Sequence, residues 1–274
     1  MIQWSSQNLT VAAAAGLAVT AMLYLVTRKR RQDTRLYELV GEVASLHIFP
    51  VKSCGVVTGD VAHCTKNGMR MFNVMDRVWA DRLDALSCGD EAGAWISQYL
   101  GENGLQLLVL LPGMATRPAR SALANSADKV GFPDKCPYHL ATEESLNDLN
   151  SRISSPEGPI SFGNFRPNIV IKGTHQPWDE DSWAYLKIGD KVKMRVLEPC
   201  DRKTYLFCRR CNLTQVDQTK RERRKDEEPL KTLRSFRMFP ENNVSPMFGI
   251  FAGLDEESDI RVGDPVYAVR RYRR

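Results

Sequence analysis

Two cysteines separated by two residues, Cys208 and Cys211, form the group with the most evident chemistry in this sequence, within the stretch FCRRCNLTQVDQ (207–218). A C-x2-C pair can be half of a zinc site, a redox dithiol, or two unrelated thiols. Arg209 and Arg210 between them would lower a thiol pKa and could bind an anion such as a phosphate. The pair therefore indicates metal, redox or anion chemistry.

Zinc and dithiol chemistry both fit this pair poorly. A structural zinc site usually needs two half-sites, but there is one C-x2-C pair and no histidine after His175. Cys200 could supply a third thiolate, and no fourth ligand is evident. A thioredoxin-type dithiol would start a helix beside a βαβ pattern, whereas this pair precedes the strand-like NLTQV. Two interpretations remain open: a thiolate beside arginines, or two reduced structural cysteines.

The elements that must position these residues are mainly strands. Helices are expected at 91–100, with Gly101 as the stop, and at 142–153, with Thr142 as the cap. Alternating or compact apolar runs predict strands at 43–49, 56–64, 105–111, 168–172, 185–188, 191–197, 214–216 and 265–269. The many short strands indicate a barrel or sandwich that carries a few helices, which is a mainly β, α+β fold.

An apolar segment near the N-terminus predicts a membrane anchor. Residues 9–27 carry no charge and nearly reach the length that crosses a bilayer, and a basic cluster, 28–31, follows at once. No charged side chain precedes the segment, which favours a retained anchor over a cleaved presequence. The cluster predicts that the rest of the chain stays in the cytosol. A short Ala-rich span with a basic flank is compatible with the mitochondrial outer membrane.

The overall charge is mild and is a weak argument for a nucleic-acid partner. The net charge is +5, much of it from the two ends and one inner run, so nucleic acid is not indicated. The inner run, KRERRKDEE (220–228), favours a solvated surface, with a basic docking surface for an acidic protein as the alternative.

Several longer motifs occur in an order typical of one family. They are FPVKSC (49–54), MDRVW (75–79), SLNDLNSR (145–152), NFRPNIVI (164–171), RRCNLTQVDQ (209–218), SPMFG (245–249) and VGDPVY (262–267). On these motifs, nearly everything after residue 35 resembles the mitochondrial amidoxime-reducing components, membrane-anchored molybdenum enzymes of the MOSC (molybdenum cofactor sulfurase C-terminal) superfamily.

The resemblance implies a domain layout and a site. The layout is an anchor with its basic flank at 1–35, an incomplete N-terminal β domain at 38–80, and a helical segment with a MOSC-type β-barrel at 81–272. Cys211 corresponds to the molybdenum ligand and Asp217 to a catalytic aspartate, whereas Cys208 is a neighbour that binds no metal. The molybdenum–molybdopterin cofactor would be held by Lys52, Ser53, Arg77, Lys135, Cys136, Arg166, Asn168, Arg209, Arg210 and Phe251.

The activity that the resemblance implies is reduction of N-hydroxylated compounds, such as amidoximes and hydroxylamines. Electrons would come from NADH through cytochrome b5 reductase and cytochrome b5, on the cytosolic side of the mitochondrial outer membrane. The sequence departs from the family in a shortened stretch after Arg77, an added segment before Cys208, DKCP (134–137) in place of D-T-S-P, and Phe251 in place of tyrosine. The alternative is therefore an inactive or alternatively spliced anchored relative that acts as a binding protein.

Overall fold

A computed structural model describes most of the chain after the expected anchor. The described residues are 35–52, 54–68, 72–73, 77–78, 81–83, 85–111, 114, 116–201, 213–217, 220, 222–238 and 245–271, with the backbone alone at 72–73, 77–78, 81–82 and 200–201. None of their helices is both long and apolar enough to cross a membrane. The predicted anchor at 9–27 lies outside the described residues.

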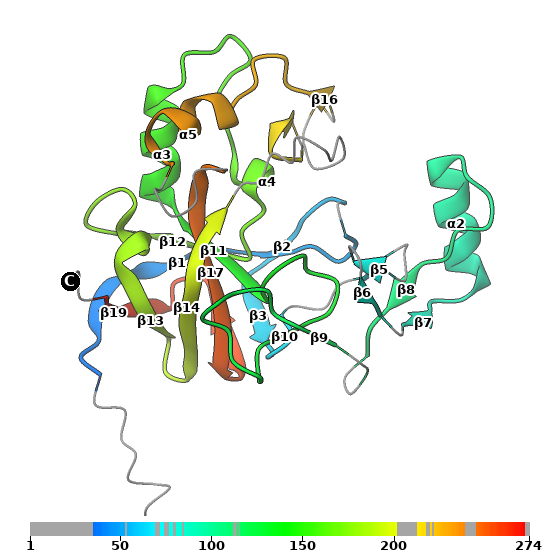
Figure 1. Cartoon of the computed structure of the whole chain (residues 1–274), viewed down its shortest axis with the longest axis horizontal. Helices are drawn as coiled ribbons and strands as arrows, with labels where there is room; N and C mark the ends of the chain where they lie inside the picture. Colours follow the sequence, from blue (N-terminus) through cyan, green and yellow to red (C-terminus); the bar gives the residue numbers. More distant parts are fainter. Residues whose placement is uncertain are drawn as a thin grey trace, which may run out of the picture. The chain divides into compact units, whose positions relative to one another are not determined.

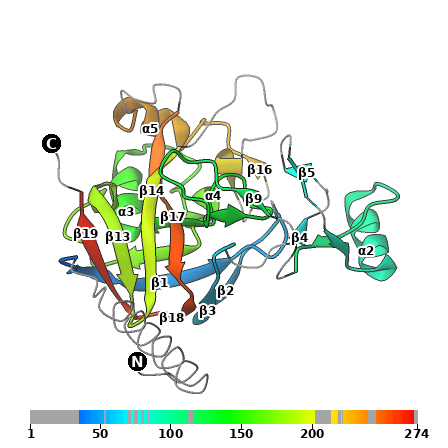
Figure 2. The same cartoon turned by 60° about the horizontal axis from the view of Figure 1, so that its bottom comes forward.

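Seven strands close into a barrel (Figures 1 and 2). Around the barrel their order is β12 (Ile169–Lys172), β11 (Tyr138–Thr142), β17 (Met247–Glu256), β14 (Val192–Asp201), β13 (Trp183–Ile188), β19 (Pro265–Arg270) and β1 (Glu38–Ile48). β1 then pairs with β12, and β2 (Val57–Gly59) extends from β1. Only β11 and β12 are parallel among the described barrel strands. The predicted mainly β architecture with a barrel is confirmed.

The barrel interior is a continuous apolar core. Strand alternation places Leu186 and Ile188 inward from β13. A register shift between Val43 and Ser45 lets β1 turn both Val43 and Leu46 inward, and all four side chains are at most 1% exposed. Burying each such side chain stabilises the fold by about 1.5–3 kcal/mol.

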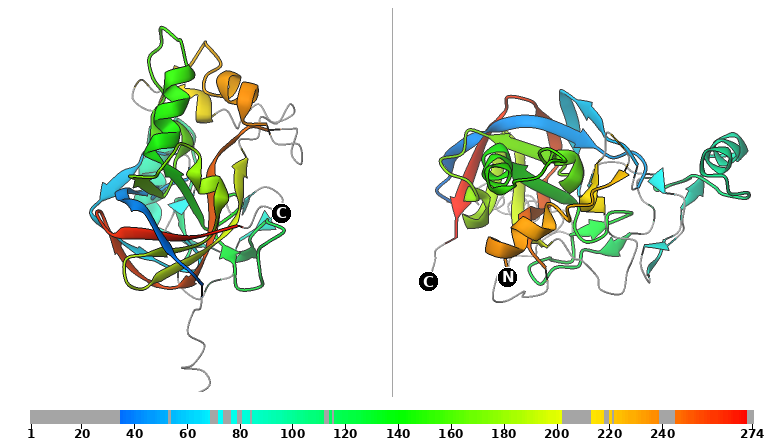
Figure 3. Two further views of the ribbon diagram at one scale, coloured as in Figure 1. Left: turned by 90° about the vertical axis from the view of Figure 1, so that its left-hand side faces the viewer. Right: turned by 90° about the horizontal axis from the view of Figure 1, so that it is seen from above.

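Three helices gather at one end of the barrel, as Figures 1 and 3 show. They are α3 (Glu143–Arg152), α4 (Phe162–Phe165) and α5 (Leu230–Phe236), and their apolar residues form a second core. Phe165 of α4 stacks on Phe248 of β17 with 3.7 Å between ring centroids, which fixes α4 to the barrel wall. Thr142 caps α3 as expected, because its Oγ1 accepts a hydrogen bond from Ser145 N at 3.2 Å.

Shorter elements complete the described chain. β3 (Val61–Cys64) pairs with β18 (Ser258–Arg261), and β15 (Val216–Asp217) pairs with β16 (Glu222–Arg223). The remaining elements are β4 (Phe72–Asn73), β5 (Arg77–Val78), β6 (Asp81–Arg82), β7 (Leu86–Ser87), α2 (Asp90–Leu100), β8 (Leu108–Val109), β9 (Arg117–Pro118), β10 (Lys129–Val130), η1 (Asp179–Ser182) and η2 (Leu213–Gln215).

Several expected elements differ in detail from those observed. The strand expected at 56–64 breaks at Asp60, because its first part pairs with β1 and its second with β18. The strand expected at 105–111 shrinks to Leu108–Val109, and the one expected at 214–216 is mostly the turn η2. The helix at 91–100 forms and ends at left-handed Gly101, but Trp95 and Tyr99 of its expected apolar face are 58% and 63% exposed.

The predicted boundary near residue 80 is not visible as a break in strand pairing. β1 pairs with β12 and β19, and β3 pairs with β18, so strands before residue 80 are bound to strands well after it. Residues 37–274 form one compact unit. The division into 38–80 and 81–272 stays a prediction.

Gly249 provides a test of how tightly β17 packs on β11. Its φ is +71°, and a Cβ there would lie 2.3 Å from Leu140 O and 2.6 Å from His139 Nε2. We expect Gly249→Ala to destabilise the protein by roughly 3–5 kcal/mol, from left-handed strain plus steric clash. Gly104 is the matched control, since its φ is +79° and its surroundings are open. Gly104→Ala should cost only about 1–2 kcal/mol. Equal losses in urea unfolding would contradict the predicted clash.

A second test concerns the buried carboxyl group of Glu180. Its side chain is fully buried in η1, where Oε2 accepts hydrogen bonds from Thr142 Oγ1 at 3.0 Å and Ser145 Oγ at 2.9 Å. Burial, and secondarily the nearby Asp181 carboxylate, raise the pKa of Glu180 from 4.5 to about 7. Asp181 itself is paired with Arg237.

The sign of the resulting pH dependence follows from which state holds the proton. Between pH 4.5 and 7 the unfolded chain has lost the Glu180 proton while the folded chain keeps it, so stability falls as pH rises. The loss is roughly 3 kcal/mol and persists above pH 7. Glu180→Gln should match the wild type at pH 4.5 and exceed it at pH 8 in urea midpoint, whereas exposed Glu102→Gln should not. A wild-type pH profile in Glu180→Gln would refute this assignment.

Candidate functional site

The sequence-predicted site residues divide into two sets. Cys208, Arg209, Arg210, Cys211 and Ser53 lie outside the described residues, and only the backbone of Arg77 is described, in β5. The side chains that can be placed are those of Lys52, Lys135, Cys136, Arg166, Asn168, Asp217 and Phe251. Among the described residues no group of three or more His, Cys, Asp or Glu side chains could hold a metal ion.

Five residues from five adjacent barrel strands or strand ends form a row that organises this set. We call them the cross-strand row: Glu198, Phe251, His139, Asn168 and His47. Phe251 of β17 lies opposite both Glu198 of β14 and His139 of β11. Asn168 N donates to His139 O at 2.7 Å, and His47 N donates to Asn168 O at 2.9 Å. The row therefore spans β14, β17, β11, the start of β12 and β1.

Asn168 joins strands within this row. Its Oδ1 accepts a hydrogen bond from His139 N at 3.0 Å, and its Nδ2 lies 3.5 Å from His47 O. Both contacts are with backbone, so the described role of Asn168 is to fix β11 and β1 beside the start of β12. Its expected contact with a cofactor stays a prediction.

Arg166 connects the NFRPN and FPVKSC motifs at one end of the row. It ends α4 in the left-handed conformation with φ 58°. Its guanidinium lies over the Phe49 ring, 3.9 Å from the centroid, and Nη1 donates to Cys54 O at 2.6 Å. Burial lowers the pKa of Arg166 to about 10, which leaves it charged at neutral pH.

Lys52 and Lys135 connect the DKCP loop to two other segments. Lys52 Nζ lies 2.6 Å from Asp134 Oδ1 and donates to Phe132 O at 3.0 Å. Lys135 Nζ lies 2.6 Å from Glu198 Oε1 and 5.8 Å from the centroid of the Phe251 ring. Two predicted residues, Lys135 and Phe251, thus meet at the other end of the cross-strand row.

Arg117 holds the same loop and was missed by the sequence analysis. Its side chain is 5% exposed and donates from Nη2 to the carbonyls of Pro133 and Asp134, the latter at 2.9 Å. Cys136, which follows, is 4% exposed. The segment 112–133 reads as an ordinary loop in the sequence, so no pattern distinguished this arginine.

Asp217 lies at a turn beside the segment that follows Cys211. Its Oδ1 accepts from Lys220 N at 2.9 Å, and its Oδ2 lies 3.9 Å from Lys220 Nζ. Asn164, which was not predicted as a site residue, donates from Nδ2 to Thr214 O and Val216 O, each at 3.0 Å. The described contacts of Asp217 are those of a residue that stabilises a turn, and a catalytic role stays a prediction.

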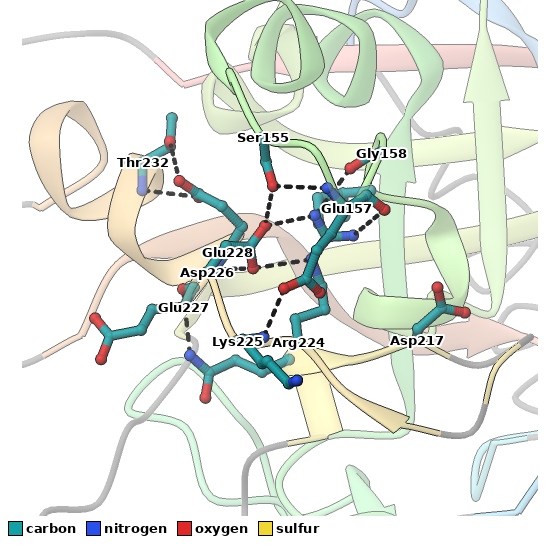
Figure 4. Close-up of polar contacts among 12 residues, drawn as sticks. Ser155, Glu157, Gly158, Asp217, Arg224, Lys225, Asp226, Glu227, Glu228 and Thr232 are labelled. Carbon is teal, nitrogen blue, oxygen red and sulfur yellow. Dashed lines mark hydrogen bonds and ion pairs between the residues drawn. The ribbon is translucent and has the colours of Figure 1, made fainter.

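The charged run at 220–228 is not simply a solvated surface, which corrects that expectation. Arg224 and Glu228 are each 5% exposed, because their side chains turn inward and form polar contacts (Figure 4). The exposed members that the structure describes are mixed in sign: Lys220, Glu222, Arg223, Lys225 and Glu227. A basic docking surface for an acidic protein stays a prediction.

Cationic side chains lie near both ends of the cross-strand row. They are Arg166, next to Phe49 and Cys54, and Lys52 and Lys135, which are paired with Asp134 and Glu198. Cationic donors are what a phosphate requires. Within the described part of the chain, the Arg166 side chain makes one hydrogen bond, through Nη1. That these residues hold the phosphate of a pterin cofactor stays a prediction.

Comparison with known proteins identifies the family of this chain. The MOSC domain model matches residues 127–267, and that of the MOSC N-terminal beta barrel domain matches residues 40–81. Human mitochondrial amidoxime-reducing component 1 is 33% identical, covering 93% of this chain and 91% of its own length. Mouse component 1 is 32% identical, with 93% and 90% covered, and human component 2 is 31% identical, with 93% and 92% covered.

The alignments also bear on chain length. The match to the mouse protein runs over 322 residues, more than the 274 of this chain, so the relative contains residues within the aligned range that have no counterpart here. Even so, the two domain matches and the identity over most of the chain establish that this protein belongs to the MOSC-domain family of mitochondrial amidoxime-reducing components.

Proposed function

We propose that this protein is a molybdenum-cofactor-dependent reductase that removes oxygen from N-hydroxylated compounds such as amidoximes and hydroxylamines. The observation that carries the proposal is the family membership, together with three cations around the cross-strand row. The overall reaction takes up two electrons and two protons, converts N–OH to N–H and releases water. NADH, cytochrome b5 reductase and cytochrome b5 are the proposed electron source.

The roles of the chain's own residues follow from their chemistry. Cys211 would supply the thiolate ligand, and the arginines before it, with Lys52 and Arg166, would hold the pterin phosphate. When bound, the molybdenum cofactor supplies the two-electron oxygen transfer. Phe251, whose ring lies 5.8 Å from that of His139, offers an apolar wall and no hydroxyl donor. Asp217 would orient a polar group near the metal.

The proposed location is the mitochondrial outer membrane, with the barrel facing the cytosol. The proposal is supported by the names of the relatives, which are mitochondrial, and by the apolar segment 9–27 followed by basic residues. An anionic partner such as cytochrome b5 would be favoured electrostatically by the net charge of +5.

A second candidate function is partner binding without catalysis. It is favoured by the length difference, because the mouse relative carries aligned residues that this chain lacks. Such a protein would keep the barrel and would contain no molybdenum.

Metal analysis of the purified full chain separates the two candidates. We expect about one molybdenum per chain in the wild type and none in Cys211→Ala, because this thiolate is the proposed ligand. Cys208→Ala and Cys200→Ala are matched controls, and both should keep the metal. Metal-free wild-type protein, expressed in a host that makes the cofactor, would refute the reductase. Loss in Cys200→Ala alone would instead assign the ligand to Cys200.

Turnover is then tested separately from metal content. Benzamidoxime reduction with NADH, cytochrome b5 reductase and cytochrome b5 should depend on all three components and disappear in Cys211→Ala. A molybdenum-loaded protein that leaves benzamidoxime and a panel of hydroxylamines unchanged would rule out the proposed substrate class.

A further inference from the structure

The segment 213–217 begins two residues after Cys211 and is held on both sides. On one side, the carbonyls of Thr214 and Val216 accept hydrogen bonds from Asn164. On the other side, the carbonyl of Gln215 accepts from Arg224 N at 2.7 Å. Successive carbonyls therefore bind opposite neighbours, which prevents the segment from moving toward either one.

The Asn164 side chain is held by hydrogen bonds at both its amide oxygen and its amide nitrogen. Its Oδ1 accepts from Ser161 N at 3.1 Å and from Ser161 Oγ at 3.3 Å, while Nδ2 makes the two bonds to the segment. The side chain is 5% exposed. The next residue, Phe165, stacks on Phe248 of the barrel, so Asn164 transmits the position of β17 to the segment.

Arg224, on the opposite side of the segment, is also held by several hydrogen bonds, as the close-up in Figure 4 shows. Its Nη2 donates to Asp226 Oδ2 at 2.7 Å and to Gly158 O at 2.8 Å. Asp226 in turn accepts from Ser155 Oγ. Burial alone would raise the pKa of Asp226, but the hydrogen bonds from Arg224 and Ser155 prevail and lower it to about 2.

The side chain of Gln215 adds a further connection. It is 4% exposed, donates from Nε2 to Glu227 O at 3.2 Å and accepts at Oε1 from Arg223 Nη2 at 3.0 Å. The turn at 222–228 and the loop at 155–158 are thereby joined to the segment after the cysteine.

This bracing fixes the described segment that follows Cys211 in the sequence. We propose that Asn164 and the Arg224–Asp226 pair are positioning residues that hold the segment after Cys211 before any cofactor binds. The inference rests on the proposed function for its catalytic meaning, although the bracing itself can be measured without metal.

Asn164→Asp tests the brace with almost no change in size. The aspartate replaces the donating amide with an oxygen that faces the carbonyls of Thr214 and Val216, so both bonds are lost. Asn150→Asp is the matched control, because Asn150 also uses its amide in two backbone bonds, to Ile160 O at 2.9 Å and from Ile160 N at 2.8 Å. Those bonds lie in the loop after α3 and leave 213–217 untouched.

The primary readouts are taken on metal-free full chain. Hydrogen–deuterium exchange of the peptide containing 213–217 and the alkylation rate of the Cys211 thiol should each rise about tenfold in Asn164→Asp. Asn150→Asp should leave both at wild-type values. Equal changes in the two variants, or no change in Asn164→Asp, would overturn the inference.

Two further arms separate this inference from the proposed function. If circular dichroism shows that Asn164→Asp does not fold, Asp226→Asn is used instead, because it weakens the hold of Arg224 on the segment 213–217. The same hydrogen–deuterium exchange measurement then tests the inference. Molybdenum content should fall in Asn164→Asp and Asp226→Asn and should not fall in Asn150→Asp. A wild type without molybdenum would refute the reductase, while exchange would still support or overturn the brace.

Discussion

The antiparallel pairing of β1 with β12 is the constraint on which the rest of the molecule depends. It joins Val43 to Ile171 and Leu46 to Ile169, and thereby closes a sheet that would otherwise end in two exposed edges. Because the strands are antiparallel, the end of β1 comes to lie beside the start of β12. The FPVKSC motif therefore meets the NFRPN motif, and Arg166 reaches the Phe49 ring. The continuity of the cross-strand row from His47 to Glu198 follows from the same closure.

The functional region thus depends on sheet register more than on any single loop. His139, Phe251 and Glu198 are opposite one another because β11, β17 and β14 are adjacent and in register. Lys135 then contacts two members of the row at once. A one-residue slip would turn Phe251 to the other face of the sheet and separate it from Lys135. Gly249, two residues earlier, allows β17 to pack closely on β11, because a Cβ there would lie 2.3 Å from Leu140 O.

Much of the fold could be predicted from the sequence, and the failures have physical reasons. β13, WAYLKI, shows the alternation of a strand with one buried face, and Thr142 has the chemistry of a helix cap. β17, MFGIFAGLDE, was not predicted because nearly all of it is buried, so it lacks alternation and contains two glycines. The run at 220–228 was misjudged because composition does not reveal that Arg224 turns inward to Asp226.

The same distinction holds for the site. Motif order selected Lys52, Lys135, Arg166 and Phe251, which the fold places along the cross-strand row and at its ends, but it assigned Asn168 a cofactor role without showing its backbone contacts. Asn164 and Arg117 position other segments by donating hydrogen bonds to backbone carbonyls. Every residue has a backbone carbonyl, so the sequence does not indicate which ones accept these bonds. Such residues become recognisable only once the strands that they connect are placed.

The closure of the barrel also determines when it can form. β1 is the first described strand, yet two of its neighbours are β12, in which Ile169 pairs with Leu46, and β19, in which Ala268 pairs with Glu38. Contacts this distant in sequence make folding slow, because the loop entropy is lost before the pairing is gained. During synthesis, β1 can pair early only with β2, through Leu46–Ile48, and its pairing with β19 must wait until almost the entire chain has left the ribosome. A nascent protein of this design has reason to depend on chaperones until its last strand emerges.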